Sequence, residues 1–305
     1  MISLLAELLS TRPRSERFID FPHWWASTTP VRARWGATVD RAIALGHASD
    51  RLAMAFAGGY TSALVALDPS LGEEPGAFCA TEDEGGHPRG IKTRLEQGRL
   101  TGTKRFISLG PWAKTLVVVA SEGTSHDGRN RLRVLRVPAA SVGVHLEPGP
   151  LLPFIPEVAH ASVVFEGVEV QPSNVLAGDG YEAYVKPFRT IEDLHVHAAI
   201  LGYLLRVATL TGWPSELHEG LLAALVAAHG LGSMDATSPA THLALAGWLA
   251  VGERILADAA PHWSAVEATE RERFERDRPL LDVATKARQG RRRRAWELIA
   301  SQRVG

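Results

Sequence analysis

Hydrophobic and polar positions follow two different periodicities along this chain. Residues 1–70 are rich in alanine and leucine, and Leu4 and Leu8 have the spacing of one helix face. From about residue 77, short β-branched runs such as TLVVVAS and ASVVFEGVEV are separated by Gly, Pro, Asn and Asp, a pattern typical of strands and turns. From Tyr181 onward the pattern is helical again, and Gly212 follows the first long helical segment.

The order of helices, strands and helices predicts an α+β fold and argues against a doubly wound α/β fold. We expect three domains: a short N-terminal helical domain over 1–76, a middle β-barrel or sandwich domain over 77–180, and a C-terminal helical domain over 181–305. Further helices are predicted over 216–229, 240–260 and 279–300.

Charge and cysteine content narrow the class of protein. The 305 residues carry a formal net charge of −1, which gives no general attraction to nucleic acid or to an anionic membrane. No uncharged apolar run reaches the length of about 20 residues that spans a bilayer. The N-terminus lacks the basic region of a signal peptide. Cys79 is the one cysteine and lies in a predicted strand, so we expect a core residue of a cytoplasmic protein.

The stretch from residue 78 to 121 holds most of the chemically useful side chains. Thr81 and Ser108 provide hydroxyls, Phe106 provides an aromatic face, and Gly85-Gly86 forms a glycine-rich turn. Backbone N–H groups in such a turn can approach a phosphate closely, and aromatic rings can flank a planar ligand. A plain β-hairpin with glycines at its turns explains the same composition, so both interpretations stay open at this point.

Five ordered landmarks give this stretch a resemblance to a known family. They are Thr81-Glu82, Ile91-Lys92-Thr93, Gly102-Thr103-Lys104 with Ile107-Ser108, Val164-Phe165-Glu166-Gly167-Val168, and Pro172-Ser173-Asn174-Val175-Leu176. In this order they resemble the middle domain of acyl-CoA dehydrogenases, over residues 77–205. Several ordered matches are far more specific than one short motif. The chain is similar to a shortened, divergent member of that family.

The resemblance implies that FAD is the cofactor, with its flavin ring between the β-domain and the C-terminal helices. Thr81 and Ser108 would then hydrogen-bond the flavin, and Phe106 would pack on its face. Relatives carry a serine and an aspartate after the small-residue turn. This chain has His87-Pro88 there instead, so the Gly86 amide or His87 would hold the cofactor pyrophosphate.

The resemblance also implies a catalytic base. Most members take a glutamate from a loop near the C-terminus, and this chain ends at Gly305, where that loop would begin. A minority, including the isovaleryl and long-chain enzymes, place the glutamate on the first C-terminal helix. Glu192 has that spacing from Leu201-Gly202, although Asp193 replaces the usual arginine. The other interpretation is that Glu192 only solvates or caps the start of the helix.

The implied function is α,β-dehydrogenation of an acyl thioester such as acyl-CoA in fatty acid metabolism. An electron-transfer-flavoprotein-like acceptor and a homo- or hetero-oligomer would accompany it. The main alternative is a degenerate, non-catalytic subunit or binder that pairs with a full-length homologue. A third hypothesis keeps the flavin and changes the reaction, as in related monooxygenases and nitroalkane oxidases.

Two further groups of residues carry weaker expectations. His195 and His197 are two residues apart on a predicted helix, so they face different directions and make a poor metal pair. The sequence predicts no metal site. The basic run from Arg291 to Arg294 is expected to be a solvated helix face or a subunit contact.

Overall fold

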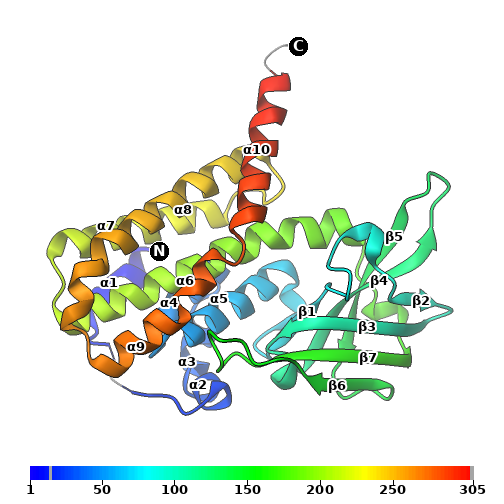
Figure 1. The fold of residues 1–305 in the computed structure, drawn as a ribbon, viewed down its shortest axis with the longest axis horizontal. Helices are drawn as coiled ribbons and strands as arrows, with labels where there is room; N and C mark the ends of the chain where they lie inside the picture. The colour runs from blue at the N-terminus through cyan, green and yellow to red at the C-terminus, as the bar shows by residue number, and fades with distance from the viewer. Residues whose placement is uncertain (14–15, 303–305) are drawn as a thin grey trace. The chain divides into compact units, whose positions relative to one another are not determined.

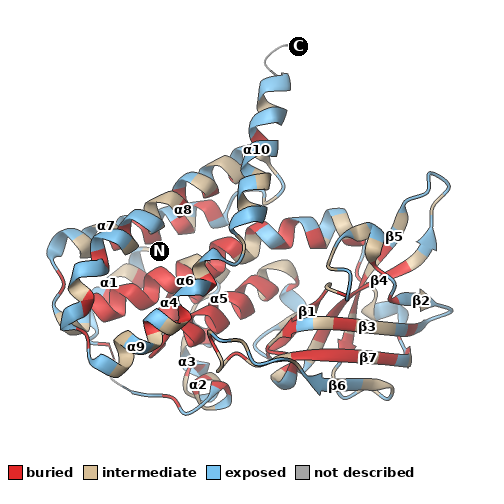
Figure 2. Ribbon diagram, viewed as in Figure 1, coloured by how far each residue is buried: buried red, intermediate tan, exposed pale blue. Residues whose placement is uncertain are grey.

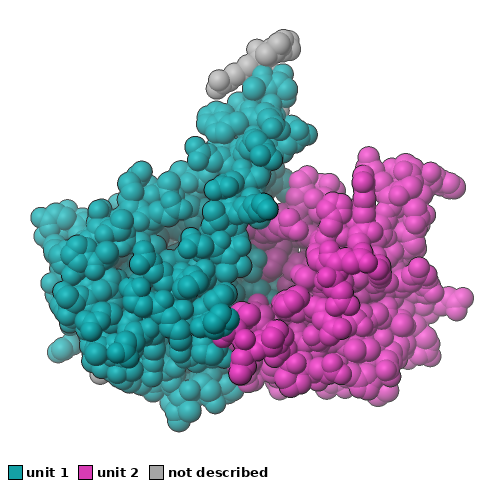
Figure 3. All heavy atoms as spheres, in the orientation of Figure 1, with its two compact units in different colours: residues 1–66, 153–157, 190–305 teal, residues 67–152, 158–189 magenta. Residues whose placement is uncertain are grey.

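The computed structural model describes residues 1–13 and 16–302 and divides the chain into two compact units (Figure 3). The first, the helical unit, consists of Met1–Ala66, Pro153–Glu157 and Thr190–Gly305. The second, the sheet unit, consists of Leu67–Leu152 and Val158–Arg189. Helical segments from both ends of the sequence therefore belong to one unit, and the division into three domains stays a prediction.

The helices account for most of the first unit (Figure 1). They are α1 (Ile2–Ser10), α2 (Phe21–Ser27), α3 (Thr29–Arg34), α4 (Thr38–His47), α5 (Leu52–Leu67), α6 (Lys186–Thr211), α7 (Ser215–Gly232), α8 (Pro239–Ala259), α9 (Ala268–Asp277) and α10 (Thr285–Gln302). Helix α6 starts in the sheet unit and runs through the helical unit. Gly212 follows it with a φ of 66°, the left-handed conformation that commonly ends helices.

Helix α6 packs against α4 and α5 at points where the backbones nearly touch. A Cβ atom added to Gly46 of α4 would lie 1.8 Å from the Ala199 carbonyl oxygen. A Cβ atom added to Gly59 of α5 would lie 2.5 Å from the Val196 Cα atom. Figure 2 shows α5 and the middle of α6 coloured as buried. Glycine at these two crossings lets the helices approach more closely than any side chain would allow.

The segment Pro153–Glu157 belongs to the helical unit although it lies between two strands in sequence. The Ile155 backbone N–H donates to the buried Asp277 carboxylate over 2.7 Å. The Glu157 carboxylate accepts from Arg276, with the shorter N–O distance at 2.8 Å. Because Asp277 and Arg276 also pair with each other, this segment is fastened to the end of α9.

Among the described residues, seven strands form one sheet (Figure 1). They are β1 (Gly76–Cys79), β2 (Arg94–Glu96), β3 (Arg99–Ser108), β4 (Thr115–Thr124), β5 (Asn130–Pro138), β6 (Val144–Pro148) and β7 (His160–Glu169). The order is β1-β4-β2-β3-β7-β6, and β5 pairs with β4. Strands β1 and β2 run parallel to β4, and the remaining pairs are antiparallel.

Strand β4 explains why TLVVVAS is a continuous apolar run rather than an alternating one. Leu116 and Val118 lie in one core cluster of the sheet unit. Val117 and Val119, which point the other way along a strand, lie in a second cluster. Both faces of β4 are therefore buried, and both require apolar side chains.

The helices after the sheet agree with the sequence prediction at α7 and α8 and differ beyond them. Helix α9 was not predicted, because its sequence ATERERFERD is almost entirely charged and only Phe274 supplies a buried apolar side chain. The helix predicted over 279–300 begins at Thr285 instead. A 3₁₀ segment with Pro279 in its first turn, Arg278–Asp282, precedes it.

One helical stretch among the described residues, Tyr181–Thr211, is long and apolar enough to cross a membrane. Within its most apolar part, 78% is buried inside the protein, as expected of a core helix. Its composition therefore reflects packing inside the chain.

Gly46→Ala should lower the free energy of unfolding by about 2 kcal/mol or more, because the added methyl group meets the Ala199 carbonyl oxygen. Gly247→Ala on α8 is the matched control, since nothing lies within 4 Å of a Cβ atom there. That control should be neutral or stabilising by up to about 1 kcal/mol, from helix propensity. Urea unfolding measures both, and equal stability of the two variants would contradict the close packing of α4 on α6.

Candidate functional site

Thr81 follows β1 at a point where several backbone groups meet. Its carbonyl oxygen accepts from the Arg105 N–H over 2.9 Å, which places Thr81 beside the end of β3. A Cβ atom added to Gly86 would lie 3.6 Å from the Thr81 Oγ1 atom, so Gly86 and the Thr81 hydroxyl are neighbours. Gly85, with a φ of 93°, closes the turn that leads from Glu82 to Gly86. The structure thus brings Thr81 and Gly86 together.

Glu82 anchors this turn from inside the sheet unit. Its carboxylate lies 2.7 Å from the Lys104 ammonium group and accepts from the Thr93 hydroxyl and the Thr93 and Lys92 N–H groups. Glu82 and Lys104 are both buried. Burial alone would raise the pKa of Glu82, but the hydrogen bonds from Lys104 and from the backbone outweigh it and hold that pKa below its usual range. Two of the five sequence landmarks are therefore joined by one buried ion pair.

Phe106 sits at an irregularity of β3. The pairing of β3 with β7 shifts between Lys104 and Ile107, and Phe106 has a φ of 53°. A bulge of this kind turns a side chain out of the regular alternation of the strand. The Phe106 side chain is 60% exposed although it is aromatic. A left-handed non-glycine backbone combined with an exposed aromatic ring is typical of a binding surface.

Ser108 ends β3 and has a partner that the sequence did not reveal. Its Oγ atom lies 3.1 Å from the His160 Nε2 atom, and the two residues are direct neighbours across β3 and β7. The His160 ring also hydrogen-bonds the backbone of Val158. Burial lowers the pKa of His160, so the imidazole is neutral at pH 7. A neutral imidazole held in this way orients the Ser108 hydroxyl.

His87 is exposed and caps a short 3₁₀ segment, Pro88–Gly90. Its Nδ1 atom accepts from the Arg89 N–H over 3.3 Å. With Nδ1 as an acceptor, the ring carries a proton on Nε2, which is a donor suited to a phosphate oxygen. His87 can therefore donate a hydrogen bond from the same loop as Gly86.

Glu192 belongs to the helical unit, whereas the other candidates belong to the sheet unit. It lies partly buried on α6, one turn before Val196. The adjacent Asp193 is buried and bonded to Arg288 over 2.9 Å and to Arg291 over 2.5 Å. Asp193 is thus neutralised by two guanidinium groups of α10, so the two neighbouring acids have different environments.

The two histidines of α6 and the basic run of α10 lie in different surroundings. His195 bonds Thr38 over 2.9 Å, whereas His197 lines a cavity against α8, so the two imidazoles do face different directions. In residues 1–13 and 16–302, no group of three or more His, Cys, Asp or Glu side chains could hold a metal ion. Within the basic run, Arg293 and Arg294 form exposed ion pairs with Glu297, whereas Arg291 pairs with the buried Asp193.

The sequence could not reveal His160 or Arg105 as site residues. His160 contacts Ser108 only through the register of β3 against β7, and register is set by tertiary pairing. The Arg105 Nε atom donates to the Asp83 carboxylate over 2.9 Å, and Asp83 lies in the glycine turn. The one usable signal was the position of His160 at the start of a β-branched run, which does not identify its partner.

Comparison with solved structures identifies the fold. PigA with FAD and proline matches with a TM-score of 0.69 and 13% identity, over 97% of this chain and 96% of that chain. Butyryl-CoA dehydrogenase from Megasphaera elsdenii matches with a TM-score of 0.67 and 15% identity, over 87% and 83%. FMN-bound TdsC from Paenibacillus sp. A11-2 matches with a TM-score of 0.61 and 17% identity, over 79% and 77%.

These likenesses confirm the predicted α+β fold of the acyl-CoA dehydrogenase type. No family model matches the sequence. No curated protein matches it either. The three solved structures therefore share the fold of this chain, although their sequences are only 13–17% identical to it.

Glu82→Gln should lower the free energy of unfolding by about 3 kcal/mol, because it leaves Lys104 buried without its charge partner. Glu84→Gln, which removes an exposed and solvent-screened ion pair with Lys92, should leave the free energy of unfolding nearly unchanged.

We expect the stability difference between the wild type and Glu82→Gln to depend on pH. Since the folded pKa of Glu82 is below its unfolded value, its stabilising contribution is present above the unfolded pKa and is lost as the pH falls through the folded pKa. The stability difference between the wild type and Glu82→Gln should therefore shrink in acid. Urea unfolding at several pH values measures it, and a difference that grows in acid would contradict the assignment.

Proposed function

We propose that this chain is a flavin-dependent oxidoreductase that binds FAD and removes hydrogen across the α,β bond of an acyl thioester. The fold supports the proposal at the level of architecture. PigA and butyryl-CoA dehydrogenase share that fold, and PigA was solved with FAD bound. The proposals for the cofactor, the substrate and the roles of single residues rest on the site residues of this chain.

The observation that carries the proposal is the exposed Phe106 ring on a left-handed bulge. An apolar ring of this kind is suited to cover one face of a planar ligand. Thr81, whose carbonyl oxygen accepts from the Arg105 N–H, and Ser108, the last residue of β3, provide hydroxyls for hydrogen bonds. Gly86 and the His87 Nε2 atom provide donors for a pyrophosphate. These residues fit FAD, which accepts hydride when it is bound.

Glu192 is the residue that we propose as the base for the α-proton. A carboxylate that is partly buried on a core helix is a suitable general base when a substrate excludes the remaining water. Asp193 is already bonded to Arg288 and Arg291, so it does not compete for that role. We further propose an acyl-CoA-like substrate, an electron-transfer-flavoprotein-like acceptor, and a cytoplasmic location.

A second candidate function is a non-catalytic subunit that pairs with a homologous chain. The observation that favours it is on α10, where Trp296 is 52% exposed and Leu298 is 37% exposed. Large apolar side chains that are exposed on a helix are suited to a protein contact. Size-exclusion chromatography with FAD absorbance separates the two candidates, because only the first requires the isolated chain to bind flavin.

Phe106→Ala should weaken FAD binding about tenfold, because it removes the aromatic face without disturbing a core. Val142→Ala is the matched control, since Val142 is 96% exposed in the same unit. Titration of the purified protein with FAD, followed by the visible spectrum, gives both affinities. Equal affinities would remove Phe106 from the site, and no spectral change in the wild type would contradict the flavin proposal.

Glu192→Gln should reduce dehydrogenation of a thioester substrate by at least about a hundredfold while FAD binding is retained, because the amide cannot accept the α-proton. Glu216→Gln, an exposed acid near the start of α7, should leave turnover unchanged. Reduction of an artificial electron acceptor measures both rates. Full turnover in Glu192→Gln would assign the base to another residue.

A further inference from the structure

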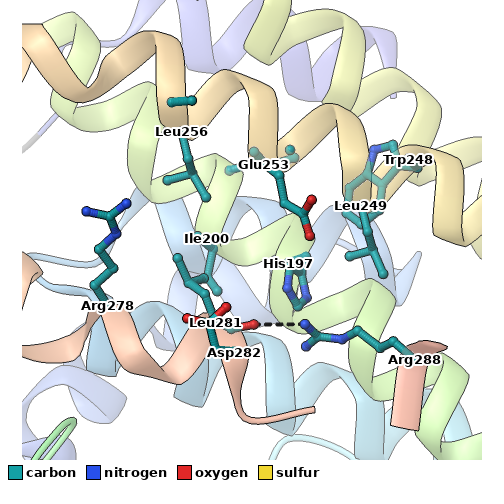
Figure 4. A pocket seen from close by; sticks show the side chains of 13 residues that line it. His197, Ile200, Trp248, Leu249, Glu253, Leu256, Arg278, Leu281, Asp282 and Arg288 are labelled. Carbon is teal, nitrogen blue, oxygen red and sulfur yellow. Dashed lines mark hydrogen bonds between the residues drawn. The ribbon is translucent and has the colours of Figure 1, made fainter. Parts of the chain in front are cut away.

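A cavity of about 220 Å³ opens at the surface of the helical unit, among α6, α8, the segment Arg278–Asp282 and α10 (Figure 4). Its walls are mainly apolar and include Ile200, Leu249 and Leu256. Small-molecule sites are usually apolar clefts with a few fixed polar groups. At this volume the cavity suits a molecule smaller than a drug-sized ligand.

His197 supplies the polar group inside this cavity. Its Nδ1 atom bonds the Asp193 carbonyl oxygen over 2.8 Å, so the ring carries its proton on that side. Burial, with the charge of Arg288, lowers the pKa of His197 to about 4, so the ring is neutral at pH 7. The Nε2 atom is then an acceptor, and in the described part of the chain no group donates to it.

Glu253 supplies the second acceptor. Figure 4 shows its carboxylate on α8 directed toward His197 on α6, from the opposite wall of the cavity. Neither residue forms an ion pair with the other or with any further residue within the described ranges. Two acceptors that face one space favour a ligand group that carries hydrogen-bond donors.

Four charged side chains line the cavity, Glu253, Arg278, Asp282 and Arg288, and their charges determine the sign of that group. Arg288 is paired with Asp193 and donates to the Leu281 carbonyl oxygen over 2.8 Å. Arg278 is largely exposed and lies 3.8 Å from Glu275. Both cations thus have acidic or carbonyl partners, whereas the Glu253 carboxylate has none among the described side chains. A positive ligand is therefore favoured over a neutral or negative one.

We propose that this cavity binds a small primary amine with an apolar body, with its ammonium group between His197 Nε2 and the Glu253 carboxylate. The branched apolar end packs against Ile200, Leu249 and Leu256. None of these contacts uses a residue proposed for flavin binding. The amine would therefore bind at a second site and would not take part in the proposed reaction.

The test uses 3-methylbutylamine, with 3-methylbutanol and 3-methylbutanoate as probes of equal shape and different charge. Binding is followed by the NMR signals of the His197 ring in the full chain. The amine should give a saturable shift, and Glu253→Gln should weaken it about tenfold. The carboxylate should not bind.

Gly252 offers a variant that fills the cavity. It lines the cavity, and nothing lies within 4 Å of a Cβ atom added to it. Gly252→Leu should abolish amine binding, whereas Gly247→Leu, on the same helix and equally open, should retain it. Thermal unfolding checks that both glycine variants are folded. If Gly252→Leu does not fold, Glu253→Gln provides the test, because it changes only an exposed side chain.

Three results would overturn the proposal. The first is the absence of saturable amine binding to the wild type, which would leave a cavity that holds water alone. The second is binding of the alcohol or the carboxylate as tightly as the amine. The third is an affinity for the amine that is unchanged in both Glu253→Gln and a folded Gly252→Leu.

Discussion

The close backbone contact of α6 with α4 and α5 determines the direction in which each side chain of α6 points. Gly46 and Gly59 allow the approach, and Gly202 of α6 repeats it from the other side, where an added Cβ atom would lie 2.3 Å from the Ile43 carbonyl oxygen. Such contacts fix both the position and the rotation of the helix, because no side chain stands between the backbones to give way.

With its rotation fixed, α6 assigns neighbouring residues to different environments. Glu192 lies on the stripe that continues through Val196 and Ala199, the residues in contact with α5 and α4. Asp193 and His197 lie on the next stripe, which faces α10 and the cavity beside α8. A rotation of 100° per residue therefore separates a proposed catalytic acid from a buried structural acid.

The sheet unit uses a comparable device in its strands. The buried pair of Glu82 and Lys104 joins the glycine turn to β3, and the next two residues of β3 form the bulge that exposes Phe106. A charged pair in the core is costly unless every polar atom is bonded, and the Glu82 carboxylate accepts four hydrogen bonds. The ion pair thus holds β3 against the glycine turn directly before the bulge that exposes the ring.

The sequence alone determined the fold class, the strand-rich middle and most of the helices, because hydrophobic periodicity is a local property of the chain. It also singled out the glycine turn, Phe106 and Ser108, because their residue types suit a planar, phosphate-bearing ligand. It could not place His160 beside Ser108 or pair Asp193 with Arg288, because residues 52 and 95 positions apart meet only through strand register and helix packing. Nor could it show that Pro153–Glu157 is held by the end of α9, or that His197 and Glu253 face one cavity. Those juxtapositions depend on how rigid elements pack against one another, which the tertiary structure alone decides.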